Sequence, residues 1–349
     1  GKPNNGLINI PVPTADKYNL IGNPYPSAMD ADLFITNAIN KDLMTGALYF
    51  WTHNTGISDN GSAYVYSSND YAVYTLTGGT SGTPVKTPAV SGGPAPSGQI
   101  AAGVAFFVKS TKAGSFEFNN SMRISSSSSN SQFFKQSNTK KTASVEKSRV
   151  WLNLSNSDGI FKQMLVGYIA GASNDLDKLY DGATFAGNTY VDFYSVNKEN
   201  NLTIQGRALP FDKKDKVPLG YSTTIAGTFE ISIANADGVL ANQTVFVEDN
   251  VTQTVHNLKE GSYSFTTAKG KFNDRFTLVY VDKNAVVVPP VVVEPPVVEP
   301  PVVVSPPVVV EPPVVVEPPV VVSPPVTVEP PVVVEPPVVV SPPVVVEPP

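Results

Sequence analysis

A proline-rich repeat places the strongest limit on how this chain of 349 residues can fold. Pairs of prolines recur from residue 289 to residue 349, and from Ser305 onward the usual unit is Pro-Pro-Val-Val-Val followed by Glu or Ser. Proline fixes φ and has no amide donor, so proline pairs at this spacing exclude a helix. Valine also prefers extended backbone. The repeat therefore predicts an extended polyproline II rod with three residues per turn.

The unit of six residues makes two turns, so each Glu or Ser falls on one edge of the rod and the other two edges are apolar. The residue in the last position follows a period of 18, which indicates duplication of a longer unit. Two interpretations remain open. The repeat is either a semi-rigid spacer or an interaction rod whose valine edges pack on a partner, on its own chain or on sister rods.

The rest of the chain predicts an all-β fold. Apolar and polar residues alternate in short runs, and Gly, Asn, Asp or Pro separates the runs. This pattern is typical of sandwiches, and we expect two tandem, jelly-roll-like β-sandwich domains. Ser27 could cap one short helix through Asp30 and Phe34, and residues 78–98 are expected to form a surface loop. The predicted strands lie within residues 63–66, 72–76, 104–108, 150–154, 165–169, 229–233, 244–248 and 275–280.

A serine- and lysine-rich stretch divides the predicted β region. Residues 125–148 have the composition of a linker, with five consecutive serines. The expected organisation is a first sandwich over 1–124, the linker, a second sandwich over 149–284, and the stalk over 285–349.

Charge and composition exclude several classes of protein. The chain has 24 basic and 30 acidic residues, and seven of the acidic residues lie in the repeat. The remaining 23 nearly balance the 24 basic residues, so we expect no nucleic-acid partner, which would need a clustered basic face. There is no cysteine, and therefore no disulfide or thiolate metal site.

The sequence carries no recognisable catalytic motif. The only two histidines, His53 and His256, lie far apart and not at zinc-ligand spacing. There is no GxSxG, no P-loop and no GxGxxG after a strand. We predict no catalytic residues and a non-enzymatic protein. An enzyme that uses Asp30 and Asp32 as an acid pair is a third, weaker alternative.

Two acidic groups are candidate calcium sites, because Ca²⁺ prefers oxygen-rich loops. The competing interpretation is turn and helix-cap chemistry, in which Asp is common. No other cofactor is expected. The candidate ligands are Asp30, Asp32, Asp175, Asp177 and Asp181.

Aromatic residues crowd one stretch of the predicted first domain and could form a sugar-binding platform. Trp51, Tyr64 and Tyr66 are the candidate ligand-binding residues. Alternating aromatic residues in a sandwich also belong to cores, so both interpretations stay open.

Several segments resemble a recurring C-terminal β-rich module of flavobacterial secreted surface proteins. The resemblance runs from Gly1 to about Tyr280 and does not include the repeat. It rests on residues 19–27 (NLIGNPYPS), 48–54 (LYFWTHN), 149–154 (RVWLNL), 204–210 (IQGRALP), 217–221 (VPLGY) and 272–276 (FNDRF).

The resemblance implies an adhesin-like protein that the type IX secretion system of Bacteroidota exports. In such relatives a sorting domain usually follows, whereas here the repeat stands in that place. We expect an extracellular, outer cell-surface location and a structural or adhesive role. Expected partners are the secretion machinery or other outer-membrane surface proteins, and the chain itself through its repeat. The alternative is a calcium-assisted glycan-binding module of a larger secreted enzyme.

Overall fold

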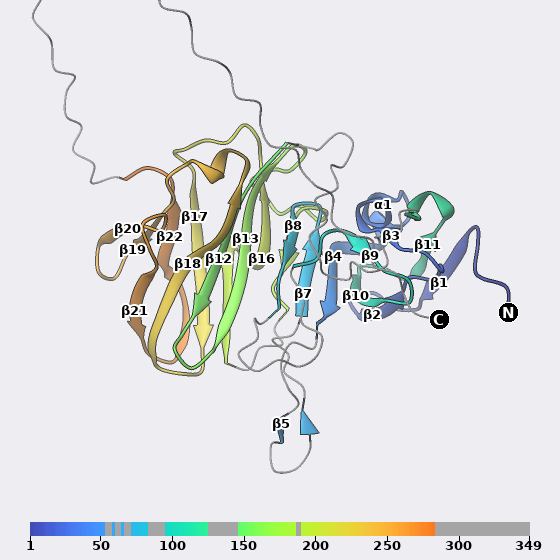
Figure 1. Ribbon diagram of the computed structural model, residues 1–349, viewed down its shortest axis with the longest axis horizontal. Coiled ribbons are helices and arrows are strands. Elements are labelled where there is room, and N and C mark those ends of the chain that lie inside the picture. The colour runs from blue at the N-terminus through green and yellow to red at the C-terminus, as the bar shows by residue number, and fades with distance from the viewer. Residues whose placement is uncertain are drawn as a thin grey trace, which may run out of the picture. The chain divides into compact units, whose positions relative to one another are not determined.

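The computed structural model describes residues 1–52, 71–82, 95–124, 146–185 and 190–282, and the backbone of 58–59 and 64–65. Gly1–Val287 form one compact unit. Within the described ranges the chain is mostly β, which confirms the predicted all-β class (Figure 1). None of the helices in these ranges is long and apolar enough to cross a membrane. The predicted polyproline rod lies outside the described residues.

The N-terminal part is built on a five-stranded sheet with the order β2-β10-β4-β7-β8. Burial alternates along its strands and shows which face packs on the core: Phe106 and Val108 are buried, while Phe107 between them is only half-buried. The strands are β2 (Tyr18–Gly22), β10 (Ala105–Ser110), β4 (Met44–Trp51), β7 (Tyr71–Thr75) and β8 (Gly78–Thr80).

Short strand pairs and two helices complete this part. Its core forms around Phe34 of α1, whose ring lies 5.5 Å from Phe106 and 4.9 Å from Phe118 between centroids. The remaining elements are β1 (Ile8–Val12) paired with β11 (Gly114–Phe118), β3 (Met29–Asp30) paired with β9 (Gln99–Ile100), β5 (Ser58–Asp59) paired with β6 (Tyr64–Val65), α1 (Ala31–Thr36), α2 (Asn40–Leu43) and the 3₁₀ helix η2 (Asn120–Met122).

The helix cap differs from the expectation. Asp30, and not Ser27, is the N-cap of α1, and its carboxylate accepts hydrogen bonds from the Asp32 and Leu33 amides. The reason is that Met29 and Asp30 pair with β9, which keeps the chain extended beyond Ser27.

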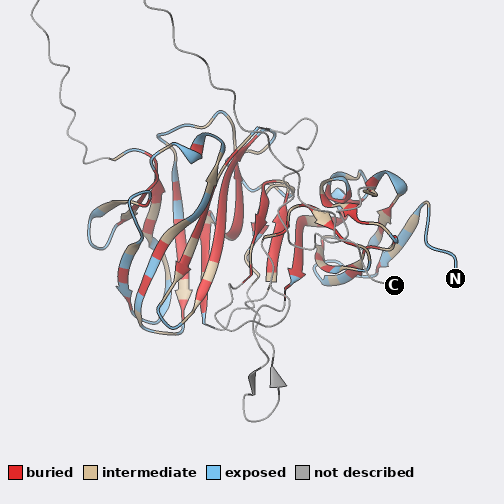
Figure 2. Cartoon of the chain, in the orientation of Figure 1, coloured by how far each residue is buried: buried red, intermediate tan, exposed pale blue. Residues whose placement is uncertain are grey.

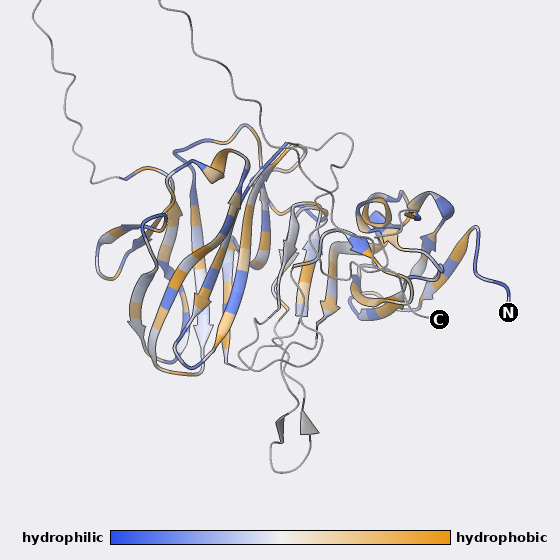
Figure 3. Ribbon diagram, in the orientation of Figure 1, coloured by the Kyte–Doolittle hydropathy of each residue, from blue (hydrophilic) through white to orange (hydrophobic). Residues whose placement is uncertain are grey.

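The C-terminal part is an eleven-stranded sheet with the order β20-β19-β22-β17-β15-β16-β13-β12-β18-β21, and β14 also pairs with β16. Along β18, buried Phe229 and Ile231 alternate with the more exposed Glu230 and Ser232, and Figure 3 shows hydrophobic and hydrophilic colours mixed along the strands of this sheet. The elements are β12 (Lys147–Ser155), β13 (Phe161–Ile169), β14 (Gly182–Ala183), β15 (Val191–Asn197), β16 (Asn200–Arg207), β17 (Lys216–Thr223), β18 (Gly227–Asp237), the 3₁₀ helix η4 (Gly238–Ala241), β19 (Phe246–Asp249), β20 (Thr254–Asn257), β21 (Tyr263–Thr267) and β22 (Gly270–Val279).

This second sheet is nearly closed. Its terminal strands meet through side chains, because the Tyr263 hydroxyl of β21 lies 3.1 Å from the Thr254 hydroxyl of β20. Tyr263 also donates a 2.9 Å hydrogen bond to Asp249 of β19. The curved sheet surrounds a large apolar core in which Phe276 packs on Phe265 at 4.7 Å between ring centroids.

The expected surface loop over 78–98 is wrong at its start. Residues 78–80 form β8, a buried strand that pairs with β7, while residues 83–94 lie outside the described residues. The Asp-Gly pair at 181–182 is also part of a packed region, because Asp181 is buried and Gly182 starts β14. In both places glycine serves close packing: a Cβ on Gly79 would lie 2.3 Å from the Pro96 carbonyl oxygen.

Candidate functional site

The N- and C-terminal parts contact each other through an apolar junction. Tyr49 of β4 and Val73 of β7 are buried against β13 and β16. Figure 2 shows the same continuity, with buried residues along β12 and β13 and again along β7 and β8. The junction core consists of Ala47, Tyr49, Val73, Trp151, Leu165 and Ile204.

Residues 173–185, here called the junction segment, connect β13 to β15 and lie against the first sheet. The Tyr180 carbonyl accepts hydrogen bonds from the hydroxyls of Thr75, at 3.0 Å, and Thr77, at 2.8 Å. The Tyr49 hydroxyl donates to the Ala183 carbonyl at 3.1 Å. A Cβ on Gly46, whose φ is +90°, would lie 1.7 Å from the Lys178 carbonyl oxygen. The segment therefore fits the first sheet closely.

Strand β12 supplies further polar contacts across the junction. The Trp151 indole donates a 2.8 Å hydrogen bond to the Gly79 carbonyl. Arg149 donates to the Thr77 carbonyl at 3.1 Å, and its guanidinium also pairs with Asp237. Apolar and polar contacts together join the two parts along the whole of β8.

Asp181 holds the junction segment in its conformation. One carboxylate oxygen accepts the Gly206 amide at 2.8 Å and the other accepts the Asp177 amide at 2.7 Å. The side chain is buried, and burial raises the pKa of Asp181 to about 7, although the two amides act to lower it. The segment therefore rests on a carboxyl group that titrates near neutral pH.

An aromatic patch lies beside the junction, on the face of the first sheet that also carries Tyr49. The Tyr18 ring is 5.0 Å from Phe185, which is 4.7 Å from Tyr71, which is 6.0 Å from Phe107, measured between centroids. Phe107 pairs across the strands with Leu20. Tyr18 is 41% exposed and Leu20 is 62% exposed. We define the aromatic patch as Tyr18, Leu20, Tyr71, Phe107 and Phe185.

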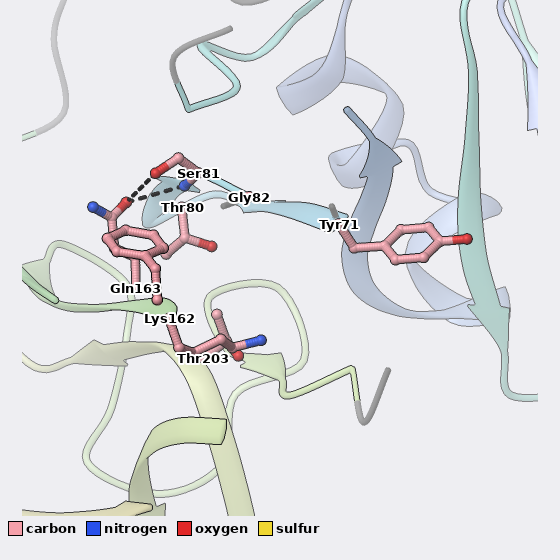
Figure 4. Close-up of a pocket in the computed structure, with 8 residues that line it drawn as sticks. Tyr71, Thr80, Ser81, Gly82, Lys162, Gln163 and Thr203 are labelled. Atoms are coloured by element: carbon pink, nitrogen blue, oxygen red, sulfur yellow. Dashed lines mark hydrogen bonds between the residues drawn. The ribbon is translucent and has the colours of Figure 1, made fainter. Parts of the chain in front are cut away.

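A small polar hollow adjoins the junction and shares Tyr71 with the aromatic patch (Figure 4). Ser81 donates two 3.0 Å hydrogen bonds, from its amide and its hydroxyl, to the Gln163 side-chain carbonyl. The hollow and the open solvent at its mouth together occupy about 220 Å³, so its enclosed part is far below the roughly 300 Å³ of ordinary small-molecule sites. The Tyr71 ring points away from it (Figure 4). The lining residues are Tyr71, Thr80, Ser81, Gly82, Phe161, Lys162, Gln163 and Thr203.

Both parts fall within one known family. A family model described as a domain of unknown function (DUF8693) matches residues 1–280. The chain belongs to DUF8693. No curated protein and no solved structure matches the chain. The DUF8693 match spans the junction and ends just before the repeat. The family region therefore contains both β parts and the junction between them.

The first candidate calcium pair in the DUF8693 region has structural partners. Asp30 caps α1, and the Asp32 carboxylate accepts a 2.7 Å hydrogen bond from the buried Tyr74 hydroxyl. In the ranges that the structure describes, no three His, Cys, Asp or Glu side chains are grouped as a metal site.

The second candidate group is brought together only in part. Asp177 accepts the Ser173 amide and Asp181 accepts the Asp177 amide, so both organise the junction segment. Asp175 is turned outward and pairs with Lys198 at 2.7 Å. Calcium binding by these residues stays a prediction.

Of the predicted aromatic ligands, only Trp51 has a side chain within the described residues. Trp51 ends β4 and is 41% exposed. Tyr64 starts β6, but its side chain, like Tyr66 and His53, lies outside the described residues. Sequence reasoning missed Tyr18, Phe107 and Phe185. Strand alternation places Tyr18 and Leu20 on one face, but Phe185 arrives from the junction segment, which no local pattern reveals.

Proposed function

We propose that this DUF8693 chain is a non-enzymatic structural or adhesive protein of the outer cell surface. Its β unit would comprise two jelly-roll-like sandwiches joined into one body, and the Pro/Val repeat would be the rod that bears it. The likeness to type IX-exported adhesin-like modules supports this location and these partners.

The observation that carries the proposal is the position of the strand that leads into the repeat. β22 is an internal strand, paired with β17 on one side and β19 on the other. Just beyond it, Tyr280 is buried and shares a hydrogen bond with Tyr168, which donates to Asp215 at 2.8 Å. A pull on the repeat would load two strand ladders at once, as a tether requires.

Single-molecule pulling on the full chain between its termini tests this role. The repeat should extend first at low force, because a polyproline II rod has no internal hydrogen bonds, and the body should yield only at higher force. Gradual loss of β22 at low force would contradict the tether. Release of products from polysaccharide or peptide substrates by the full chain would contradict the non-enzymatic role.

A second candidate function is glycan binding, calcium-assisted and within a larger secreted enzyme. The aromatic patch favours it, because sugar faces stack on aromatic rings in an otherwise polar surface. A glycan array probed with and without chelator separates this function from purely structural display.

A further inference from the structure

We propose that the aromatic patch is a docking surface for the Pro/Val repeat of a second copy of this chain. This inference rests on the structural role proposed above and assigns a surface to the assembly. Pro-rich segments in the polyproline II conformation commonly bind aromatic-lined surfaces, since the preformed rod loses little entropy on binding. The patch and the repeat match in shape, size and charge.

The angles between the rings give the patch an uneven surface. Tyr18 stands at 79° to the buried Tyr49 and at 81° to Phe185, and Tyr71 stands at 67° to Phe107. Near-perpendicular rings present edges beside faces, so the surface is stepped and can receive the proline and valine side chains of a rod. Tyr49 beneath them is 1% exposed and supports the rings from below.

The size of the patch suits one repeat unit. The Tyr18 and Tyr71 rings flank Phe185 at 5.0 Å and 4.7 Å between centroids, so the ring surface is narrower than one repeat unit is long. Six residues of a polyproline II rod span about 19 Å. One hexad can therefore cross the patch with an apolar edge towards the rings.

Charge complementarity favours the repeat as the occupant. Lys109 is the cross-strand partner of Tyr18, so it lies on the patch face, and Lys17 precedes Tyr18. With Asp16 next to them, this end of the patch carries net positive charge. The repeat has seven Glu and no basic residue, and in the predicted polyproline II rod the six Glu from Glu299 onward share one edge. An apolar acidic rod is the partner that this surface fits.

Sedimentation velocity of the full chain over a range of concentrations tests the proposal. We expect reversible oligomers that dissociate when a synthetic peptide of residues 306–323, one full period of the repeat, is added in excess. Leu20→Glu should raise the concentration needed for assembly about ten-fold or more, the effect of losing one buried leucine. Lys109→Glu should weaken assembly mainly at low salt, because screening removes its contribution at high salt.

Leu7→Glu is the matched control, because Leu7 is also 62% exposed but lies outside the patch. This variant should assemble like the parent chain. A chain that stays monomeric at every concentration, or oligomers that ignore both Leu20→Glu and the peptide, would overturn the proposal. So would a saccharide array signal that Leu20→Glu abolishes, since the occupant would then be a glycan. None of these results affects the pulling test of the tether.

Discussion

At the residue scale, the junction depends on groups whose chemistry is unusual for their position. Asp181 is a buried carboxyl group that serves only backbone amides, and Gly46 leaves space for a carbonyl from the other part of the molecule. The position of Asp181 constrains the charge of the side chain, and the position of Gly46 constrains its volume. Both constraints can be tested by single substitutions.

Asp181 should make stability depend on pH. Its folded pKa of about 7 lies above the ordinary 3.8, so between these values the folded chain keeps a proton that the unfolded chain has lost. The free energy of unfolding should fall as pH rises through this window, by at most about 1.4 kcal/mol per pH unit from this group. Urea denaturation of the Asp181→Asn variant from pH 4 to pH 8 should show a flatter dependence. Asp158→Asn, in an exposed turn, should keep the parent slope; equal slopes for both variants would contradict the assignment.

Gly46→Ala should open the junction. The new methyl group would overlap the Lys178 carbonyl, and the residue would keep a left-handed φ of +90°. We expect a loss of about 2–4 kcal/mol from overpacking and backbone strain together. Gly103→Ala is the control, because its φ is +74° but nothing lies within 4 Å, so it should lose only about 1–2 kcal/mol. Similar losses in chemical denaturation would show that Gly46 does not control the junction.

At the element scale, three strands close the second sheet through one buried ion pair. Asp249 of β19 is fully buried and pairs with Arg275 of β22 at 2.9 Å, while Tyr263 of β21 donates to the same carboxylate. Burial would raise the pKa of Asp249, but hydrogen bonds from Arg275, the Val251 amide and Tyr263 keep it below its usual value. The charge is therefore present in the folded protein.

Arg275→Met should cost about 3–5 kcal/mol, because it leaves Asp249 charged and buried without its partner. Adding Asp249→Val in the same chain should recover part of this loss, since removing both charges removes the desolvation cost. Denaturation midpoints of the two variants test the idea. A double variant that is less stable than Arg275→Met would show that the pair itself, and not its burial, supports the closure.

The sequence predicted elements better than their assembly. Alternation located most central strands, such as β10, β12 and β22, because it records one buried and one polar face. It failed for β8, whose Gly-Gly-Thr sequence has the composition of a loop although all three residues are buried. The aromatic patch could not be predicted from the sequence either. Tyr18, Tyr71 and Phe185 come from three distant segments, and only the tertiary contacts bring them together.

At the scale of the whole molecule, the two parts should unfold together. The junction core and the hydrogen bonds to Tyr180 and Ala183 couple the first sheet to the second. A cooperative unit of this kind loses both sheets in one transition. This coupling distinguishes the protein from independent domains on a flexible linker.

Tyr49→Ala should uncouple the parts. Tyr49 is buried in the junction, and truncating a large buried aromatic side chain costs about 3–5 kcal/mol. We expect the single calorimetric transition of the full chain to split into two. Phe229→Leu, in the core of the second sheet, should lower the midpoint without splitting the transition. A single transition for Tyr49→Ala would mean that the remaining contacts suffice for cooperativity.

The nearly closed second sheet affects whether copies of the protein aggregate when they are packed close together. A strand at a free sheet edge is a template on which a neighbouring chain can add its own strand and begin to aggregate. Here β20 and β21 meet through the Tyr263 and Thr254 hydroxyls, so the two terminal strands lie next to each other at this point. Many copies held close together could then collide repeatedly without merging their sheets. In the proposed surface role, such a module suits a crowded coat, in which contacts between neighbours are left to dedicated surfaces.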